Sequence, residues 1–156
     1  MARRYRVTFE QVAVSAAQDV FEIKGASGKM LRILRMAVGA TDTSVPTSQM
    51  LALRARFLPA TVTDGSGGST PTPQKIDPGD AAASFTALVN NTTKATTNGT
   101  AVTLEENSCH VQAGWDYWFP TPPIVGPSEA FVFELLSTVS GTVHLSGTME
   151  VEEIGG

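Results

Sequence analysis

The sequence contains a single cysteine, Cys109, in 156 residues, so no disulfide can form within the chain. Small secreted domains often depend on a disulfide framework, and its absence favours synthesis in a reducing, cytoplasmic environment. A chain of this length buries about two-thirds of the surface that its unfolded form exposes. We therefore expect one self-sufficient domain over residues 1–156.

Long apolar runs and an excess of basic charge are also lacking. No window approaches the roughly 18 to 20 apolar residues of a membrane span, and the basic start "MARRYRVTFE" continues into alternation instead of the apolar core of a signal peptide. The formal net charge is −4 and the pI is about 5.1, whereas nucleic-acid-binding domains usually carry a basic surface. We expect a soluble protein that binds neither membranes nor nucleic acid.

Residues suited to metal binding or catalysis are few. His110 and His144 are the only histidines, and alternation places each on the polar face of its strand. A zinc site usually needs three or four ligands, and the Cys109 thiol should point away from His110. The sequence has no nucleophile elbow, and no pair of carboxylates stands out as a candidate acid and base. The sequence predicts no enzyme activity, no metal and no cofactor.

The segment "GASGKM" resembles part of a phosphate-binding loop. That motif needs a glycine where Ile23 stands and a serine or threonine where Met30 stands. Without these residues the segment is typical of a tight turn between two strands, in which Gly25 and Gly28 supply backbone freedom.

Alternation of apolar and polar residues dominates what remains. It predicts half-buried strands in four segments, which are 5–14, 51–57, 111–119 and 142–152. Less regular strands, bounded by Gly, Pro, Asn or Asp, are expected at 19–24, 29–38, 83–89, 99–105 and 129–136. This pattern predicts an all-β, single-domain protein, either an antiparallel β-sandwich or a jelly-roll barrel.

Three places depart from the simple pattern. Arg32 and Arg35 would face opposite sides of a regular strand, which a bulge or a subunit interface would resolve. A short helix capped by Asp80 competes with a strand from Ala83, and we favour the strand. The glutamates of the closing "MEVEE", at 150, 152 and 153, are expected to be solvated at a strand end.

A long Gly/Ser/Pro-rich loop at 62–80 interrupts the strands. Its first part, "DGSGGS", is flexible by composition, whereas "TPTPQKIDPGD" is stiffened by three prolines. Connections this long are usually functional or disordered. One hypothesis is an arm that reaches a neighbouring subunit with Ile76 as its apolar anchor, and the alternative is a surface loop without a partner.

The segment "GWDYWFPTPP" is the most aromatic part of the chain. Alternation buries Trp115, Tyr117 and Phe119 but turns Trp118 outward beside Asp116. An exposed tryptophan beside a carboxylate is suited to stack on a sugar or to anchor a protein interface. The alternative is that the following "PTPPIVGP" loop covers it.

Four segments together carry a resemblance to a known class of proteins. The opening "VTFEQVAVSAAQDVFEI", the central "TPTPQKIDPGDAAASFTALVNNTT", the "VQAGWDYWFPTPP" segment and the closing "LSGTMEVEEI" resemble the capsid decoration, or cement, proteins of tailed bacteriophages. The resemblance implies a β-sandwich or jelly roll that is made in the host bacterial cytoplasm. It further implies a homotrimer that binds the major capsid protein on the outside of the virion and stabilises the shell.

The resemblance transfers no active-site residue, so interface candidates come from this sequence alone. They are exposed basic or aromatic residues and the stiff arm, namely Arg4, Arg6, Arg54, Arg56, Thr70, Pro71, Pro73, Lys75, Ile76, Asp77 and Trp118. Two alternatives remain open. One is a carbohydrate-binding or receptor-binding jelly-roll module, and the other is a low-copy tail or connector protein of the virion.

Overall fold

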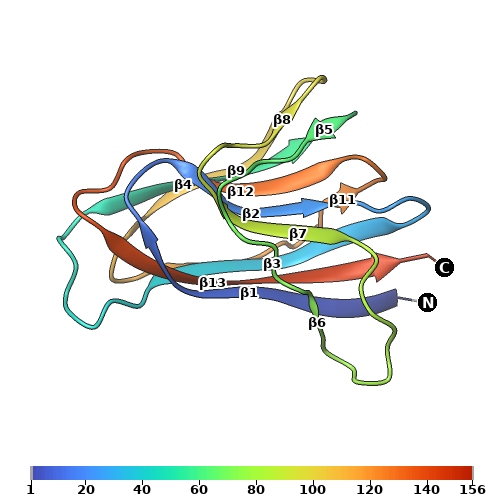
Figure 1. Cartoon of the computed structure of the whole chain (residues 1–156), viewed down its shortest axis with the longest axis horizontal. Helices are drawn as coiled ribbons and strands as arrows, with labels where there is room; N and C mark the ends of the chain where they lie inside the picture. Colours follow the sequence, from blue (N-terminus) through green and yellow to red (C-terminus); the bar gives the residue numbers. More distant parts are fainter. Residues whose placement is uncertain (1, 156) are drawn as a thin grey trace.

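Two antiparallel sheets pack face to face in the computed structural model, which describes residues 2–155 (Figure 1). The first, sheet A, has the order β10 (Trp115–Trp118), β3 (Met30–Ala40), β13 (Val143–Ile154), β1 (Ala2–Val14) and β6 (Gln74–Lys75), and β11 (Ile124–Val125) also pairs with β3. The second, sheet B, has the order β7 (Thr86–Asn91), β2 (Gln18–Lys24), β12 (Ala130–Leu135), β4 (Met50–Leu58) and β9 (Val102–His110). The predicted single-domain β-sandwich is confirmed.

The described residues include no helix, and so none that is long and apolar enough to span a bilayer. The strand alternative at 80–89 is therefore the correct one, although β7 begins at Thr86, later than Ala83. The strand expected at 99–105 is the first half of the longer β9.

The core lies between the sheets and follows the predicted alternation. Tyr5 and Val7 of β1 are fully buried, and Phe9 packs on Phe21 of β2 with ring centroids 5.1 Å apart. Phe133 of β12 meets Trp115 of β10 in the same layer at 5.3 Å. Each such side chain contributes about 1.5 to 3 kcal/mol when it leaves water. This burial fixes which face of each sheet remains outside.

The prediction of one strand over 111–119 is wrong. β9 ends at His110, a turn follows, and β10 begins at Trp115 in the other sheet. Gly114 makes this change of sheet possible, because its φ is +69° and a Cβ there would lie 2.8 Å from the Val38 carbonyl oxygen. The apolar and polar residues of 111–119 alternate as in one strand, so the sequence pattern did not indicate the turn before Trp115.

The irregularity at Arg32 and Arg35 is a β-bulge, as expected. Arg35 lies opposite Glu150 and Ile33 opposite Val151, so Leu34 has no residue opposite it. The bulge turns both arginines to the outer face of sheet A. The "GASGKM" segment is the predicted turn, which joins β2 to β3 with Gly28 at φ +73°.

A cap formed by residues 59–69 and 92–101 covers the outer face of sheet B. It contains the paired strands β5 (Val62–Thr63) and β8 (Thr96–Thr97), which project from the sandwich in Figure 1. Val62 and Ala95 of the cap pack with Ala130 and Val132 of β12 in a second, small core. The cap also buries the carboxyl groups of Asp19 and Glu22, which accept hydrogen bonds from the backbone N–H groups of Ala95 and Gly65.

The first part of the Gly/Ser/Pro-rich loop belongs to this cap. Ser66 pairs with Thr93 and Ser69 with Val89, each through two backbone hydrogen bonds of 2.9 to 3.0 Å. A Cβ on Gly68 would overlap the Val89 carbonyl oxygen. The composition that suggested flexibility instead permits close approach of two backbones.

A candidate protein-binding face on sheet A

The outer face of sheet A carries residues in rows that run across the strands. One row contains Trp118, Arg35, Glu150, Arg6 and Gln74, which lie directly opposite one another on β10, β3, β13, β1 and β6. Because neighbouring strands lie about 4.8 Å apart, the row spans about 19 Å. Residues from five separate segments of the chain thus form one continuous surface.

The next row repeats this arrangement. Ile124, Arg32, Glu152 and Arg4 lie opposite one another on β11, β3, β13 and β1. Ile76 extends the row, because its backbone N–H donates a 3.1 Å hydrogen bond to the Arg4 carbonyl oxygen. The row is charged in its centre and apolar at both ends.

Each glutamate of these rows lies between two arginines. Glu150 is 3.0 Å from Arg6 and 3.9 Å from Arg35, and Glu152 is 3.4 Å from Arg4 and 3.2 Å from Arg32. Glu150 is 5% exposed and Glu152 is 8% exposed. The arginine side chains cover them. We call this group of four arginines and two glutamates the Arg/Glu ladder.

The expectation that the glutamates of "MEVEE" are solvated is wrong for all three. Glu153 is also buried, and it accepts hydrogen bonds from the backbone N–H and the hydroxyl of Ser84 at 2.9 and 2.6 Å. These glutamates are buried because β13 is the central strand of sheet A, which their position in the sequence does not reveal.

Trp118 lies at one end of the ladder and is 56% exposed, so the following proline-rich loop does not cover it. Arg35 lies over its ring, 5.3 Å from the centroid, and donates hydrogen bonds of 2.8 and 2.6 Å to Asp116. The same guanidinium lowers the pKa of the Asp116 carboxyl below its usual range. An aromatic ring, a cation and an anion are thus held in fixed positions.

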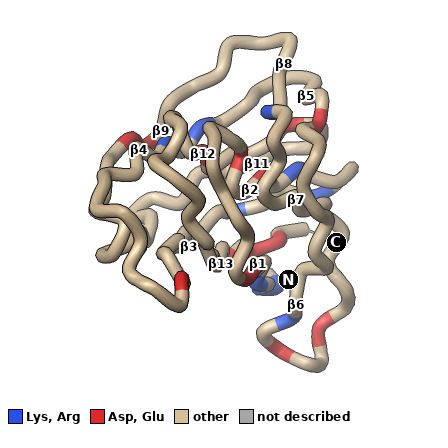
Figure 2. Tube along the Cα trace, turned by 60° about the vertical axis from the view of Figure 1, so that its left-hand side comes forward, with Lys and Arg blue, Asp and Glu red and all other residues tan. Residues whose placement is uncertain are grey.

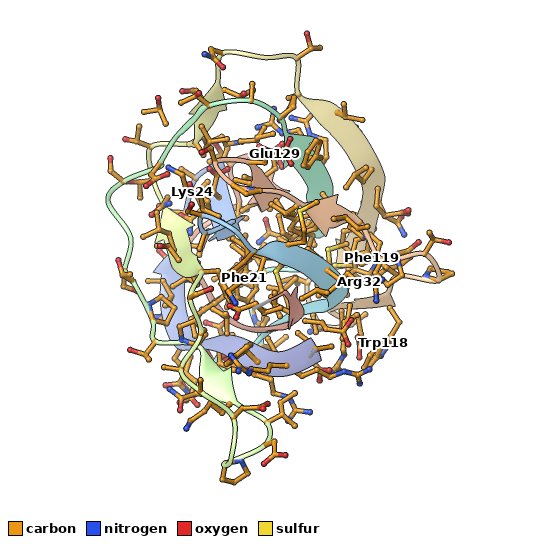
Figure 3. All side chains as sticks on the ribbon, turned by 90° about the vertical axis from the view of Figure 1, so that its right-hand side faces the viewer. Phe21, Lys24, Arg32, Trp118, Phe119 and Glu129 are labelled. Atoms are coloured by element: carbon orange, nitrogen blue, oxygen red, sulfur yellow. The ribbon has the colours of Figure 1, made fainter. Side chains whose placement is uncertain are left out.

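Large apolar side chains border the ladder. Trp118 and Ile124 lie at the β10 and β11 edge, and Ile76 lies at the β6 edge. Met30 lies two residues before Arg32 on β3, on the same face, and is 47% exposed. Figure 3 shows the labelled Arg32 and Trp118 on one side of the molecule and Phe21 in its interior. We call this face, with its ladder and apolar border, the ladder face.

A shallow trough of about 550 Å³ continues the ladder face towards the β3–β4 end. Several of its residues are small or carry hydroxyls, including Thr8, Ala37, Gly39, Ser146 and Thr148, and Glu10 and Asp116 also line it. The trough therefore offers hydroxyl groups together with two carboxylates.

The structure brings several predicted interface residues together here. Arg4, Arg6 and Trp118 belong to the ladder face, and the stiff arm lies beside it (Figure 2). The arm comprises the predicted residues Thr70, Pro71, Pro73, Lys75, Ile76 and Asp77, and it pairs with β1 of its own chain through β6. The Lys75 ammonium group donates to the carbonyl oxygens of Pro78 and Asp80 at 3.3 and 2.7 Å. Its contact with a neighbouring subunit remains a prediction.

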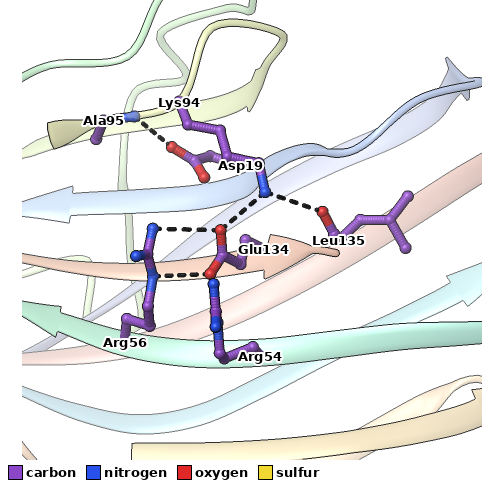
Figure 4. A network of polar contacts seen from close by, with 7 residues as sticks. All are labelled: Asp19, Arg54, Arg56, Lys94, Ala95, Glu134 and Leu135. Carbon is purple, nitrogen blue, oxygen red and sulfur yellow. Dashed lines mark hydrogen bonds and ion pairs between the residues drawn. The ribbon is translucent and has the colours of Figure 1, made fainter. Parts of the chain in front are cut away.

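Arg54 and Arg56 lie elsewhere, on the outer face of sheet B. Both bind Glu134 of β12, which is fully buried, with closest N–O distances of 2.6 and 2.7 Å (Figure 4). Lys94 of the cap binds the same carboxylate at 2.9 Å. These arginines join β4 to β12, whereas Lys94 joins the cap to the same carboxylate, and neither arginine is part of the ladder face.

Sequence reasoning missed six members of the ladder face, namely Arg32, Arg35, Glu150, Glu152, Met30 and Ile124. The first two lie beside the bulge, so the break in alternation was the available signal. Nothing in the sequence indicated Ile124, because β11 has only two residues.

The two histidines lie in different sheets. His110 is on β9 and is 2.9 Å from the Ser48 hydroxyl, whereas His144 is on β13 and is 2.7 Å from Asp42. Residues 2–155 contain no group of three His, Cys, Asp or Glu side chains placed to hold a metal ion.

No protein-family model matches this chain, and no curated protein or solved structure shows significant similarity to it.

Proposed function

We propose that the protein is a structural decoration protein that binds the outside of a phage head through the ladder face and stabilises the shell. The observation that carries the proposal is the ladder face itself, in which paired arginines are bordered by exposed Trp118, Ile124, Met30 and Ile76. Tryptophan, methionine and arginine are enriched in protein interfaces, and tryptophan and arginine in their energetic hot spots.

The rigidity of this face supports binding to a protein shell. The four arginines are already held by Glu150, Glu152 and Asp116 in the free protein. Side chains that are ordered before binding lose less conformational entropy on association. A shell that presents many identical sites adds avidity, so each contact needs only modest affinity.

The homotrimer is the part of the proposal that rests on the resemblance and on the arm. The arm lies at the edge of the ladder face, where its exposed Ile76 is available to a neighbouring copy. In this proposal the protein folds in the host cytoplasm, assembles on the virion exterior and has no catalytic role. A low-copy tail or connector position would use the same face.

A binding assay with purified heads tests the role of the ladder face. Heads from a phage lacking the gene are mixed with the protein, and bound protein is measured after sedimentation. We expect Trp118→Ala and Arg32→Glu each to weaken binding at least tenfold. Met50→Ala, which removes a similarly exposed side chain from sheet B, should bind as the wild type does. Equal binding by all four proteins would overturn the assignment of this face.

A second candidate function is carbohydrate binding, which the position of Trp118 beside the hydroxyl-lined trough favours. Aromatic rings stack on sugar faces, and the trough residues offer hydroxyl groups for hydrogen bonds. A glycan array that compares the wild type with Trp118→Ala distinguishes this function. A specific glycan signal that Trp118→Ala abolishes would support it, and the absence of any signal would count against it.

A further inference from the structure

The free edge of sheet B belongs to the sheet opposite the ladder face and has no role in the function proposed above. β9 pairs with β4 over eight residues, from Phe57 opposite Val102 to Met50 opposite His110, and no strand within residues 2–155 lies on its other side. Its burial pattern shows that most of its residues are exposed. At nine residues it is longer than a typical strand.

An edge strand presents backbone hydrogen-bonding groups to solvent at every second residue. Val111 donates to the Gln49 carbonyl oxygen at 3.0 Å, so Cys109, two residues earlier, also directs its backbone groups towards β4. Ser108 and Glu106 therefore face the free edge. The Ser108 N–H is bound by the Asn107 side chain at 2.8 Å. No segment other than β4 forms backbone hydrogen bonds with 102–108 within the described chain.

An apolar pocket opens beside this edge. It has a volume of about 280 Å³ and is lined by Leu104 of β9 together with Tyr117, Phe119, Pro120, Thr121 and Pro123. The pocket thus lies between the free edge of sheet B and the β10 edge of sheet A. Leu104 is the extra residue of a bulge and is 37% exposed, and the neighbouring Val102 is 47% exposed. The pocket is large enough to admit a large apolar side chain.

Two acidic side chains lie on this edge strand. Glu105 and Glu106 are its two carboxylates, and neither forms an ion pair within residues 2–155. Arg54 lies opposite Glu106, but its guanidinium is held 2.6 Å from Glu134. Glu105 lies near Tyr117, where its charge adds to the burial that raises the pKa of the phenol. The edge therefore attracts positive charge and repels a second acidic strand.

We propose that β9 accepts an extended, basic segment of a partner protein as an added strand, with one large apolar side chain of that segment in the Leu104 pocket. Free backbone groups would supply affinity, and the pocket and the two glutamates would supply specificity, as in other cases of strand addition. A second copy of this chain is disfavoured in registers of β9 against β9 that bring Glu105 and Glu106 close to their own counterparts. The occupant is thus a basic strand.

The test uses three labelled peptides and fluorescence anisotropy with the full chain. The peptide Lys-Val-Lys-Leu-Lys-Val-Lys is the probe, its Glu-for-Lys counterpart reverses the charge, and a version N-methylated at every residue can donate no backbone hydrogen bond from either edge. We expect binding of the first peptide only, with slower hydrogen exchange at the Glu106 amide. Equal binding of the methylated peptide would overturn strand addition.

Two double variants with the same change in net charge locate the site. Glu105→Lys with Glu106→Lys should reverse the preference between the two charged peptides. Glu10→Lys with Asp77→Lys should leave the preference for the basic peptide unchanged, because these residues lie outside sheet B. If both double variants behave alike, the attraction is general and the site is not β9.

Leu104→Asp tests the pocket separately, and we expect it to weaken binding of the basic peptide at least tenfold. Unchanged affinity would remove the pocket from the proposal. Sedimentation of the wild type and of Glu106→Pro tests whether a second copy of the chain binds at β9. An edge strand tolerates this proline substitution. Self-association that Glu106→Pro abolishes would overturn the basic partner in favour of a second copy.

Discussion

Arg6 on β1 and Glu150 on β13 lie directly opposite each other, with 3.0 Å between Nη2 and Oε1. Arg6 is exposed, whereas Glu150 is buried beneath it and Arg35. The carboxylate therefore depends on the two arginines for its compensation, because removal from water disfavours an isolated charge.

Glu150→Gln should lower the free energy of unfolding by about 1 to 2 kcal/mol, because the two cations lose their shared acceptor charge. Urea denaturation measures the change. Glu10→Gln is the matched control, since Glu10 is exposed on the same sheet, and it should change stability by less than about 0.5 kcal/mol. Equal effects of the two variants would mean that the Arg/Glu ladder contributes nothing to stability.

Glu134→Gln should have a larger effect, of about 3 kcal/mol, because Glu134 is fully buried and binds Arg54, Arg56 and Lys94. Lys94 is the only one of these cations on the cap, so Lys94→Met should lower stability less and should mainly loosen the cap. Hydrogen exchange at the Ala95 amide reports on that loosening. A loss below about 1 kcal/mol for Glu134→Gln would show that solvent compensates these charges.

The acidic residues beneath the cap predict a pH dependence. Burial raises the pKa of Asp19 to about 6 and that of Glu22 to about 7, although Asp19 accepts a hydrogen bond from the Ala95 N–H and Glu22 one from the Gly65 N–H. A second oxygen of each carboxylate has no hydrogen-bond partner within the described residues. The folded state therefore binds these protons more tightly than the unfolded state.

The sign follows from this difference. As the pH rises from about 4 to about 7, both groups ionise in the buried site and the free energy of unfolding falls. Asp19→Asn and Glu22→Gln keep a hydrogen-bond acceptor but remove the charge. The difference in unfolding free energy between each variant and the wild type should shift in favour of the variant by up to about 3 kcal/mol between pH 4.5 and pH 8. Chemical denaturation at both pH values measures this, and parallel curves for wild type and variants would contradict it.

Gly68→Ala should destabilise the cap, because a Cβ at residue 68 overlaps backbone atoms of Val89 and Asn90 that cannot move independently. We expect a loss of more than about 2 kcal/mol in thermal unfolding. Gly39→Ala is the control, since a Cβ there meets no atom within 4 Å and the glycine has no positive φ. A neutral Gly68→Ala would mean that the segment is not held against β7.

Much of the fold follows from local sequence, and the ladder face largely does not. Alternation in "YRVTFE" predicts both the buried Tyr5 and the exposed Arg4 and Arg6, because burial of one strand face is a local property. The pairing of Arg6 with Glu150 joins residues 144 positions apart, and no single strand pattern specifies strand order. Trp118 illustrates the difference between local exposure and contacts that depend on strand pairing. Its exposure was predictable, whereas Arg35 is placed over its ring by the bulge at Leu34.

Copy number in purified virions tests the central proposal most directly. Quantitative mass spectrometry of particles from the phage that encodes the chain gives the ratio of this protein to the major capsid protein. A decoration role predicts a ratio that approaches one copy per capsid subunit. A few copies per particle would instead place the protein in the tail or connector, and its complete absence would contradict a virion role.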